Sequence, residues 1–81
     1  MKAETLIELL ADQPFVPIRV HLSDGRNHVI SHPELAIVGE DAIVIGTRPD
    51  DSPGVAQHLH YCSIGQITEA HKVKEAKSNG A

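Results

Sequence analysis

Six histidines are the side chains in this 81-residue chain with the most potential for chemistry: His21, His28, His32, His58, His60 and His71. Neutral imidazoles that converge on one face are how proteins build zinc sites, and Cys62 could add a thiolate. His58 and His60 lie two residues apart, so in a strand they point to the same side. His21 or His28 could join them if the first hairpin lies close. The alternative is a solvated face of surface histidines. The lack of ligand spacing such as Cys-x-x-Cys favours this alternative, and we expect no cofactor.

The segment His32-Pro33-Glu34 is the most motif-like element of the chain. His32 and Glu34 could form an acid–base pair or contact a partner. Turn chemistry explains the same residues: His32 or Ser31 caps a short helical turn, Pro33 takes its first position, and Glu34 favours its N-terminus. The structural interpretation is favoured, and both residues stay candidates for binding a partner or an anion.

Two arginines are the other binding candidates. Asp24-Gly25-Arg26 is typical of a hairpin turn, and Arg26 beside Arg19 could form a small basic spot for an anion or for RNA. No aromatic side chain is at hand there for base stacking, and no basic stripe occurs. Before residue 71 the chain holds four basic and ten acidic residues, a balance of −6, which repels phosphate backbones. Nucleic acid is therefore disfavoured as a partner.

Catalytic signatures are weak. Cys62 and His60 could act as a nucleophile and its base, but no third group that would orient the base is evident. There is no glycine-rich phosphate loop and no recoverable Ser-His-Asp spacing. These observations favour a non-catalytic role and leave the question of enzyme activity open.

A helix and short strands must position these residues. The spacing of Ala3, Leu6, Ile7 and Leu10 predicts an amphipathic helix over residues 3–12, which Pro14 ends. Period-two apolar spacing then predicts short strands, with Leu59 and Tyr61 on the core side and His21, His58 and His60 on polar-facing positions. The predicted strands are residues 18–22, 27–31, 36–38, 42–47, 57–62 and 66–70.

This order is mainly β, with a helix before about five antiparallel strands, and it resembles SH3-like and Sm-like small barrels. The matching pieces are residues 20–26 (VHLSDGR), which make the Leu-x-Asp-Gly turn, and residues 62–67 (CSIGQI), which make a tight turn before the last strand. The resemblance implies a small barrel or a curled sheet. The alternative is an open antiparallel sheet with the helix packed across one face. No RNA-contacting residue is carried over from the Sm-like proteins.

A closer resemblance covers residues 5–70. The segment PFVPIRVHLSDGR, followed by Val29 and by His32-Pro33-Glu34, is similar to a group of short uncharacterised bacterial proteins. Their pattern is Pro-Phe-x-Pro-Phe-x-x-x-Leu-x-Asp-Gly-Arg, then a strand, then His-Pro-Glu. The chain departs from it at Ile18, where the group has an aromatic residue. The resemblance implies a fold and brings no activity.

We expect residues 1–70 to form one domain and residues 71–81 a flexible lysine-containing tail. A single cysteine and the absence of a long apolar segment predict a cytoplasmic protein without a membrane span. The favoured function is a non-catalytic interaction or oligomerisation module whose partner is a protein, either itself or another. The alternatives are an Sm-like RNA-binding protein and a small histidine-rich metal-binding protein or enzyme.

Overall fold

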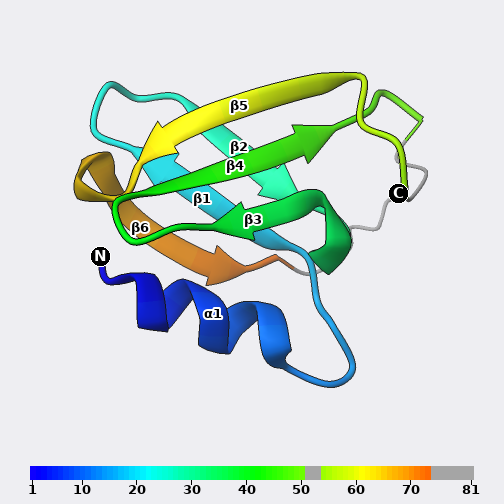
Figure 1. The fold of residues 1–81 in the computed structure, drawn as a ribbon, viewed down its shortest axis with the longest axis horizontal. Helices are drawn as coiled ribbons and strands as arrows, with labels where there is room; N and C mark the ends of the chain where they lie inside the picture. Colours follow the sequence, from blue (N-terminus) through cyan, green and yellow to red (C-terminus); the bar gives the residue numbers. More distant parts are fainter. Residues whose placement is uncertain (51–53, 74–81) are drawn as a thin grey trace.

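One N-terminal helix and two three-stranded antiparallel sheets make up the computed structural model, which describes residues 1–50 and 54–73 (Figure 1). In chain order the elements are α1 (Ala3–Ala11), β1 (Ile18–Leu22), β2 (Asn27–Ile30), the 3-10 turn η1 (Pro33–Leu35), β3 (Ala36–Val38), β4 (Ala42–Thr47), β5 (His58–Ser63), the 3-10 turn η2 (Ile64–Gln66) and β6 (Ile67–Lys72). The predicted order of a helix and short antiparallel strands is confirmed. Each of the six predicted ranges overlaps a strand, one more than in the five-stranded small-barrel layout, and the two separate sheets do not form a closed barrel.

The first sheet has the strand order β2-β1-β6. Alternation in β1 buries Ile18, Val20 and Leu22, as the period-two pattern predicts. The β1–β2 hairpin turns at Gly25, whose φ of 92° lies in the region that glycine adopts without steric cost. The Asp-Gly turn predicted from the sequence is therefore confirmed.

The second sheet has the order β3-β4-β5 and lies in front of the first in Figure 1, with α1 below both. Its central strand β4 sends Ile43 and Ile45 into the space between the sheets, where both are fully buried. The side chains of the core are Leu6, Ile18, Val20, Leu22, Ile30, Ile43, Ile45, Cys62, Ile64 and Ile67.

The prediction that Leu59 and Tyr61 face the core is wrong. Their side chains are 73% and 77% exposed, while Cys62 is buried. Residues directly opposite in an antiparallel pair share one face of the sheet, and Cys62 lies opposite Ile43. Because Ile43 is fixed in the core, the pairing turns Cys62 inward and Leu59 and Tyr61 outward. It also places His60, opposite Ile45, on the inward side of β5 rather than on the predicted polar side.

Two further predictions need correction. In α1, Leu6 is buried but Ile7 is 52% exposed, and Leu9 packs against the core instead. No side-chain hydrogen bond caps η1, so the predicted cap from His32 or Ser31 is not made. Pro33 does occupy the first turn of η1, as expected.

The C-terminal strand continues past the expected domain boundary at residue 70. β6 ends at Lys72, and the backbone N–H of Val73 donates a hydrogen bond to the carbonyl oxygen of Pro17 at 2.8 Å. His71 and Lys72 therefore belong to the sheet rather than to a tail. The remainder of the predicted tail, residues 74–81, lies outside the described residues.

Candidate functional site

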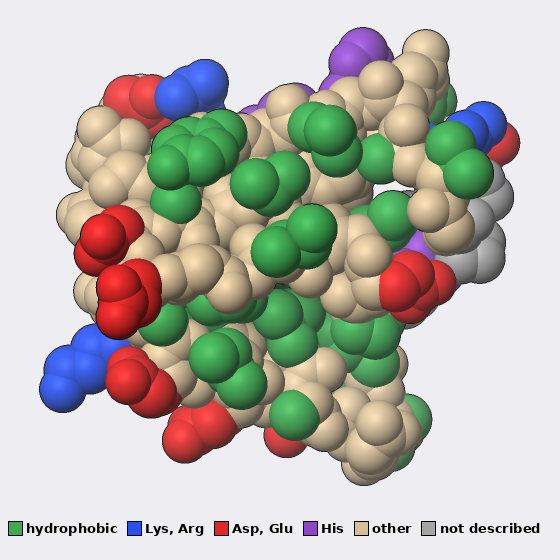
Figure 2. All heavy atoms as spheres, viewed as in Figure 1, with side chains coloured by type: hydrophobic (Ala, Val, Ile, Leu, Met, Phe, Trp, Pro, Cys, Tyr) green, Lys and Arg blue, Asp and Glu red, His purple; other side chains and the backbone are tan. Residues whose placement is uncertain are grey.

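The outer face of the β3–β4–β5 sheet carries four apolar side chains, Ile37, Val44, Leu59 and Tyr61, which we call the apolar face. Ile37 pairs with Val44 and Val44 with Tyr61, so these three form a row across the three strands. Ile37 is 71% exposed, comparable to Leu59 and Tyr61. Figure 2 shows apolar side chains gathered over this sheet. Large apolar side chains that are clustered and exposed mark interaction sites more often than isolated ones do.

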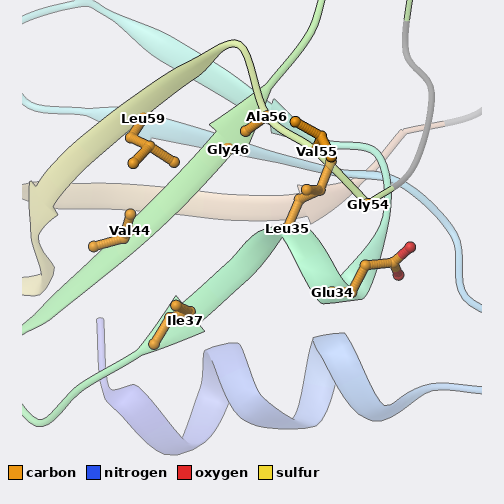
Figure 3. Close-up of a pocket in the computed structure, with 9 residues that line it drawn as sticks. All are labelled: Glu34, Leu35, Ile37, Val44, Gly46, Gly54, Val55, Ala56 and Leu59. Atoms are coloured by element: carbon orange, nitrogen blue, oxygen red, sulfur yellow. The ribbon is translucent and has the colours of Figure 1, made fainter.

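A groove of about 380 Å³ opens at one end of the apolar face (Figure 3). One wall comes from η1 and β3, the other from residues 54–56, and β4 and β5 contribute the floor. Gly46 lies in that floor, where a Cβ atom would stand 2.7 Å from the Cβ of Ala56. The missing side chain at Gly46 therefore lets residues 54–56 approach the sheet and shapes the groove.

Carboxylates border the apolar face at both ends. Glu34 lines the groove, and Figure 3 shows it at the end away from Val44. Glu40 and Asp41 line a second hollow, which Ile37, Val44 and Tyr61 also line. Figure 2 shows red side chains on either side of the green patch, and blue side chains next to red ones along its upper border. None of the described residues that line these two hollows is a lysine or an arginine.

Of the four predicted partner-binding or anion-binding residues, only Glu34 lines this groove. Arg19 lies on the other sheet, where its guanidinium donates a hydrogen bond to Asn27. Arg26 forms an ion pair with Asp24 at 2.8 Å. The backbone N–H of Arg26 also donates to that carboxylate, and this hydrogen bond is the largest cause of the lowered pKa of Asp24. Both arginines thus have polar partners within their own sheet and hairpin.

His32 is the fourth of these predicted residues. It directly precedes η1 with an extended backbone, at φ −139°. It is not among the described residues that line the groove, although Glu34 two positions later is. Within the His-Pro-Glu segment, Glu34 therefore contributes to the groove and His32 does not line it.

Five of the histidines form two groups, and of the alternatives His21 and His28 it is His28 that joins His58 and His60. His28 of β2 stacks on His60 of β5 with ring centroids 4.1 Å apart, and His58 lies 6.4 Å from His60. His21 lies away from them on the outer face of the β2-β1-β6 sheet, because it alternates with the buried Val20 and Leu22, and its Nε2 is 3.1 Å from the Nε2 of His71. Within residues 1–50 and 54–73, no three His, Cys, Asp or Glu side chains are placed to hold a metal ion.

The half-buried position of His28 leads to a pH prediction. Burial, with a smaller contribution from the charge of His60, lowers the pKa of His28 from its ordinary 6.5. The unfolded chain therefore binds the proton more readily, and the stability contributed by neutral His28 is lost as pH falls below about 6.5. We expect the urea midpoint to fall between pH 7 and 5, and to fall less in His28→Gln. If the urea midpoint of His28→Gln falls between pH 7 and 5 as much as that of the wild type, His28 is not the group responsible for the pH dependence.

Cys62 offers no reactive thiolate in this arrangement. Its thiol is buried and donates to the backbone carbonyl oxygen of His60 at 4.0 Å, while the imidazole of His60 lies 3.0 Å from the hydroxyl of Thr47. Burial also raises the pKa of the Cys62 thiol. Buried thiols of this kind are inert toward electrophiles.

We therefore expect Ellman's reagent to label native Cys62 slowly at pH 8 and the urea-unfolded chain quickly. His60→Gln should leave the native rate unchanged, because the imidazole does not activate the sulfur. Fast native labelling that depends on His60 would restore the nucleophile hypothesis.

The side chains of the apolar face were missed as functional candidates because their types are those of a core. A usable signal was present in β4: all five residues Ala42 to Gly46 are apolar, so this strand presents apolar side chains on both of its faces. One of those faces therefore had to lie outside the core between the sheets.

Comparison with known proteins finds no matching family model, curated protein or solved structure. In the described part of the chain, no helix is both long enough and apolar enough to cross a membrane. The geometry of the apolar face and its borders is therefore the basis for a functional proposal.

Proposed function

We propose that this protein is a non-catalytic interaction module that docks another protein on the apolar face. The observation that carries the proposal is that Ile37, Leu59 and Tyr61 are each more than 70% exposed on one face of the three hydrogen-bonded strands, with Val44 of the central strand between Ile37 and Tyr61. Covering such side chains is favourable by about 25 cal/mol per Å² of apolar area removed from water. A partner that covers the apolar face gains this free energy of burial without any rearrangement of the sheet.

The chemistry of the groove supports binding rather than catalysis. Glu34 is the only ionisable side chain among the described residues that line it. A single carboxylate at the edge of an apolar hollow supplies charge recognition but no acid–base pair. Rigid strands hold the apolar side chains, and sites on such elements are more precise than sites on loops.

Site-specific photo-cross-linking in the cells that make the protein tests this function. p-Benzoylphenylalanine at position 61 should give a discrete protein adduct, whereas the same group at exposed position 69 of β6 should not. Leu59→Ser should abolish the adduct, and Ile7→Ser, which removes an exposed aliphatic side chain from α1, should leave it. Equal adducts at positions 61 and 69, or none at either, would contradict the proposal.

A further inference from the structure

We infer that the partner of the apolar face is a basic amphipathic helix, with lysine or arginine at both ends of a short apolar stripe. This inference depends on the proposed docking function and adds the chemical class of the partner. It follows from the charges at the two ends of the face and from the position of the groove within the sheet.

The charge argument starts from the borders of the face. Glu34 lies at the groove end, and Glu40 and Asp41 lie at the opposite end, beside the hollow that Tyr61 lines. Arg48 also lies near the groove end, where it donates to the carbonyl oxygen of Val55, but its ion pair with Asp50 offsets its charge and leaves Glu34 as the net charge there. Charges at the rim of an interface attract a complementary partner and reject one of like sign. A ligand with apolar side chains in the middle and cations at both ends matches this pattern.

The same charges argue against a second copy of the chain docked face to face. Two apolar faces in contact bring the acidic borders of both copies together in either orientation, because the ends of each face are acidic. Like charges placed opposite each other at an interface are unfavourable. An anionic membrane surface is rejected for the same reason.

The position of the groove favours a helix over an extended strand. The groove lies on the face of the sheet, whereas the backbone groups able to pair with a new strand lie at an edge. An extended peptide across the face would bury unpaired backbone groups, while a helix satisfies its own. From Asp41 to Gly46, β4 rises about 17 Å, the length of about eleven helical residues.

The test uses two synthetic peptides and the folded full chain. Both peptides carry leucines at positions i, i+3, i+4 and i+7 of an alanine- and glutamine-rich helix. One has two lysines at each end, and its twin has two glutamates at each end. We expect the lysine peptide to bind about tenfold more tightly at low salt, and the difference to shrink at 1 M salt, where the Debye length is about 3 Å.

Variants assign the effect to the face. The triple variant Glu34→Gln/Glu40→Gln/Asp41→Asn should no longer bind the lysine peptide more tightly than the glutamate peptide. Leu59→Ser should weaken the binding of both peptides. Each variant is checked by circular dichroism and urea unfolding, so that loss of binding is separated from loss of the fold. The matched control Ile7→Ser should bind as the wild type does.

Three outcomes would overturn the inference: equal binding of the two peptides, an undiminished lysine preference in the triple variant, or tighter association with phosphatidylglycerol vesicles than with the lysine peptide. If any of these occurs while the position-61 adduct persists, the docking face stands and the chemistry assigned to the partner is wrong. If the adduct is also absent, the proposed function is wrong as well.

Discussion

Ile45→Ala is expected to lower the free energy of unfolding by about 2–4 kcal/mol, because truncating a fully buried aliphatic side chain loses transfer free energy and leaves a cavity. A domain of this size has a total stability of about 4–12 kcal/mol. The variant therefore loses a large fraction of its stability. Urea unfolding followed by circular dichroism measures the change.

Leu59→Ala is the matched control on the same sheet. Leu59 is 73% exposed on the face opposite to Ile45, so its truncation should change the free energy of unfolding by less than about 0.5 kcal/mol. Equal losses in the two variants would mean that Leu59 is buried in solution. The apolar face would then be part of a core.

Gly46→Ala is expected to lower the free energy of unfolding by about 1–3 kcal/mol, as overpacking does in a close-packed interior. The new Cβ would lie 2.7 Å from the Cβ of Ala56 and 3.5 Å from the carbonyl oxygen of Leu35. Residues 54–56 cannot retreat freely, because the adjacent Gln57 donates a backbone hydrogen bond to Thr47 at 2.9 Å. Displacement of residues 54–56 by the new Cβ should also deform the groove and weaken binding of the lysine peptide.

Gly65→Ala is the control with the same chemistry. The nearest atom to its added Cβ is the hydroxyl oxygen of Ser63 at 3.8 Å, an ordinary van der Waals contact. We expect its stability and its peptide binding to match those of the wild type. A Gly46→Ala variant as stable as Gly65→Ala would show that residues 54–56 do not pack on β4 as described.

Local patterns were enough to predict most elements of the fold. Alternation in β1, the Asp-Gly turn and Pro33 each act over a few residues, and the structure places each as expected. Alternation alone could not decide which side of β5 faces inward. Both sides of that strand hold residues that can be buried, and the pairing of Cys62 with Ile43 selects between them. That pairing joins residues about twenty positions apart.

The candidate site was less predictable than the fold because it, too, depends on strand pairing between residues distant in the sequence. Its apolar residues come from β3, β4 and β5, and only the register of the sheet brings them into one row. Of the two alternatives, His28 and not His21 joins His60, because His28 lies opposite the buried Val20 and faces the second sheet. His21 alternates with the buried Val20 and Leu22 and lies on the outer face of its sheet. There its partner is His71, a residue assigned to the tail because the sequence around it lacks apolar alternation.

The proposed docking face exists only if β5 presents Leu59 to solvent in the isolated domain. Methyl NMR with a dissolved nitroxide measures this directly, since the probe broadens the signals of accessible methyl groups. We expect strong broadening for Ile37 and Leu59 and little for Ile43 and Ile45, in line with their exposure. Protected Leu59 methyls in a monomeric sample would place that side chain inside the protein and contradict the docking face.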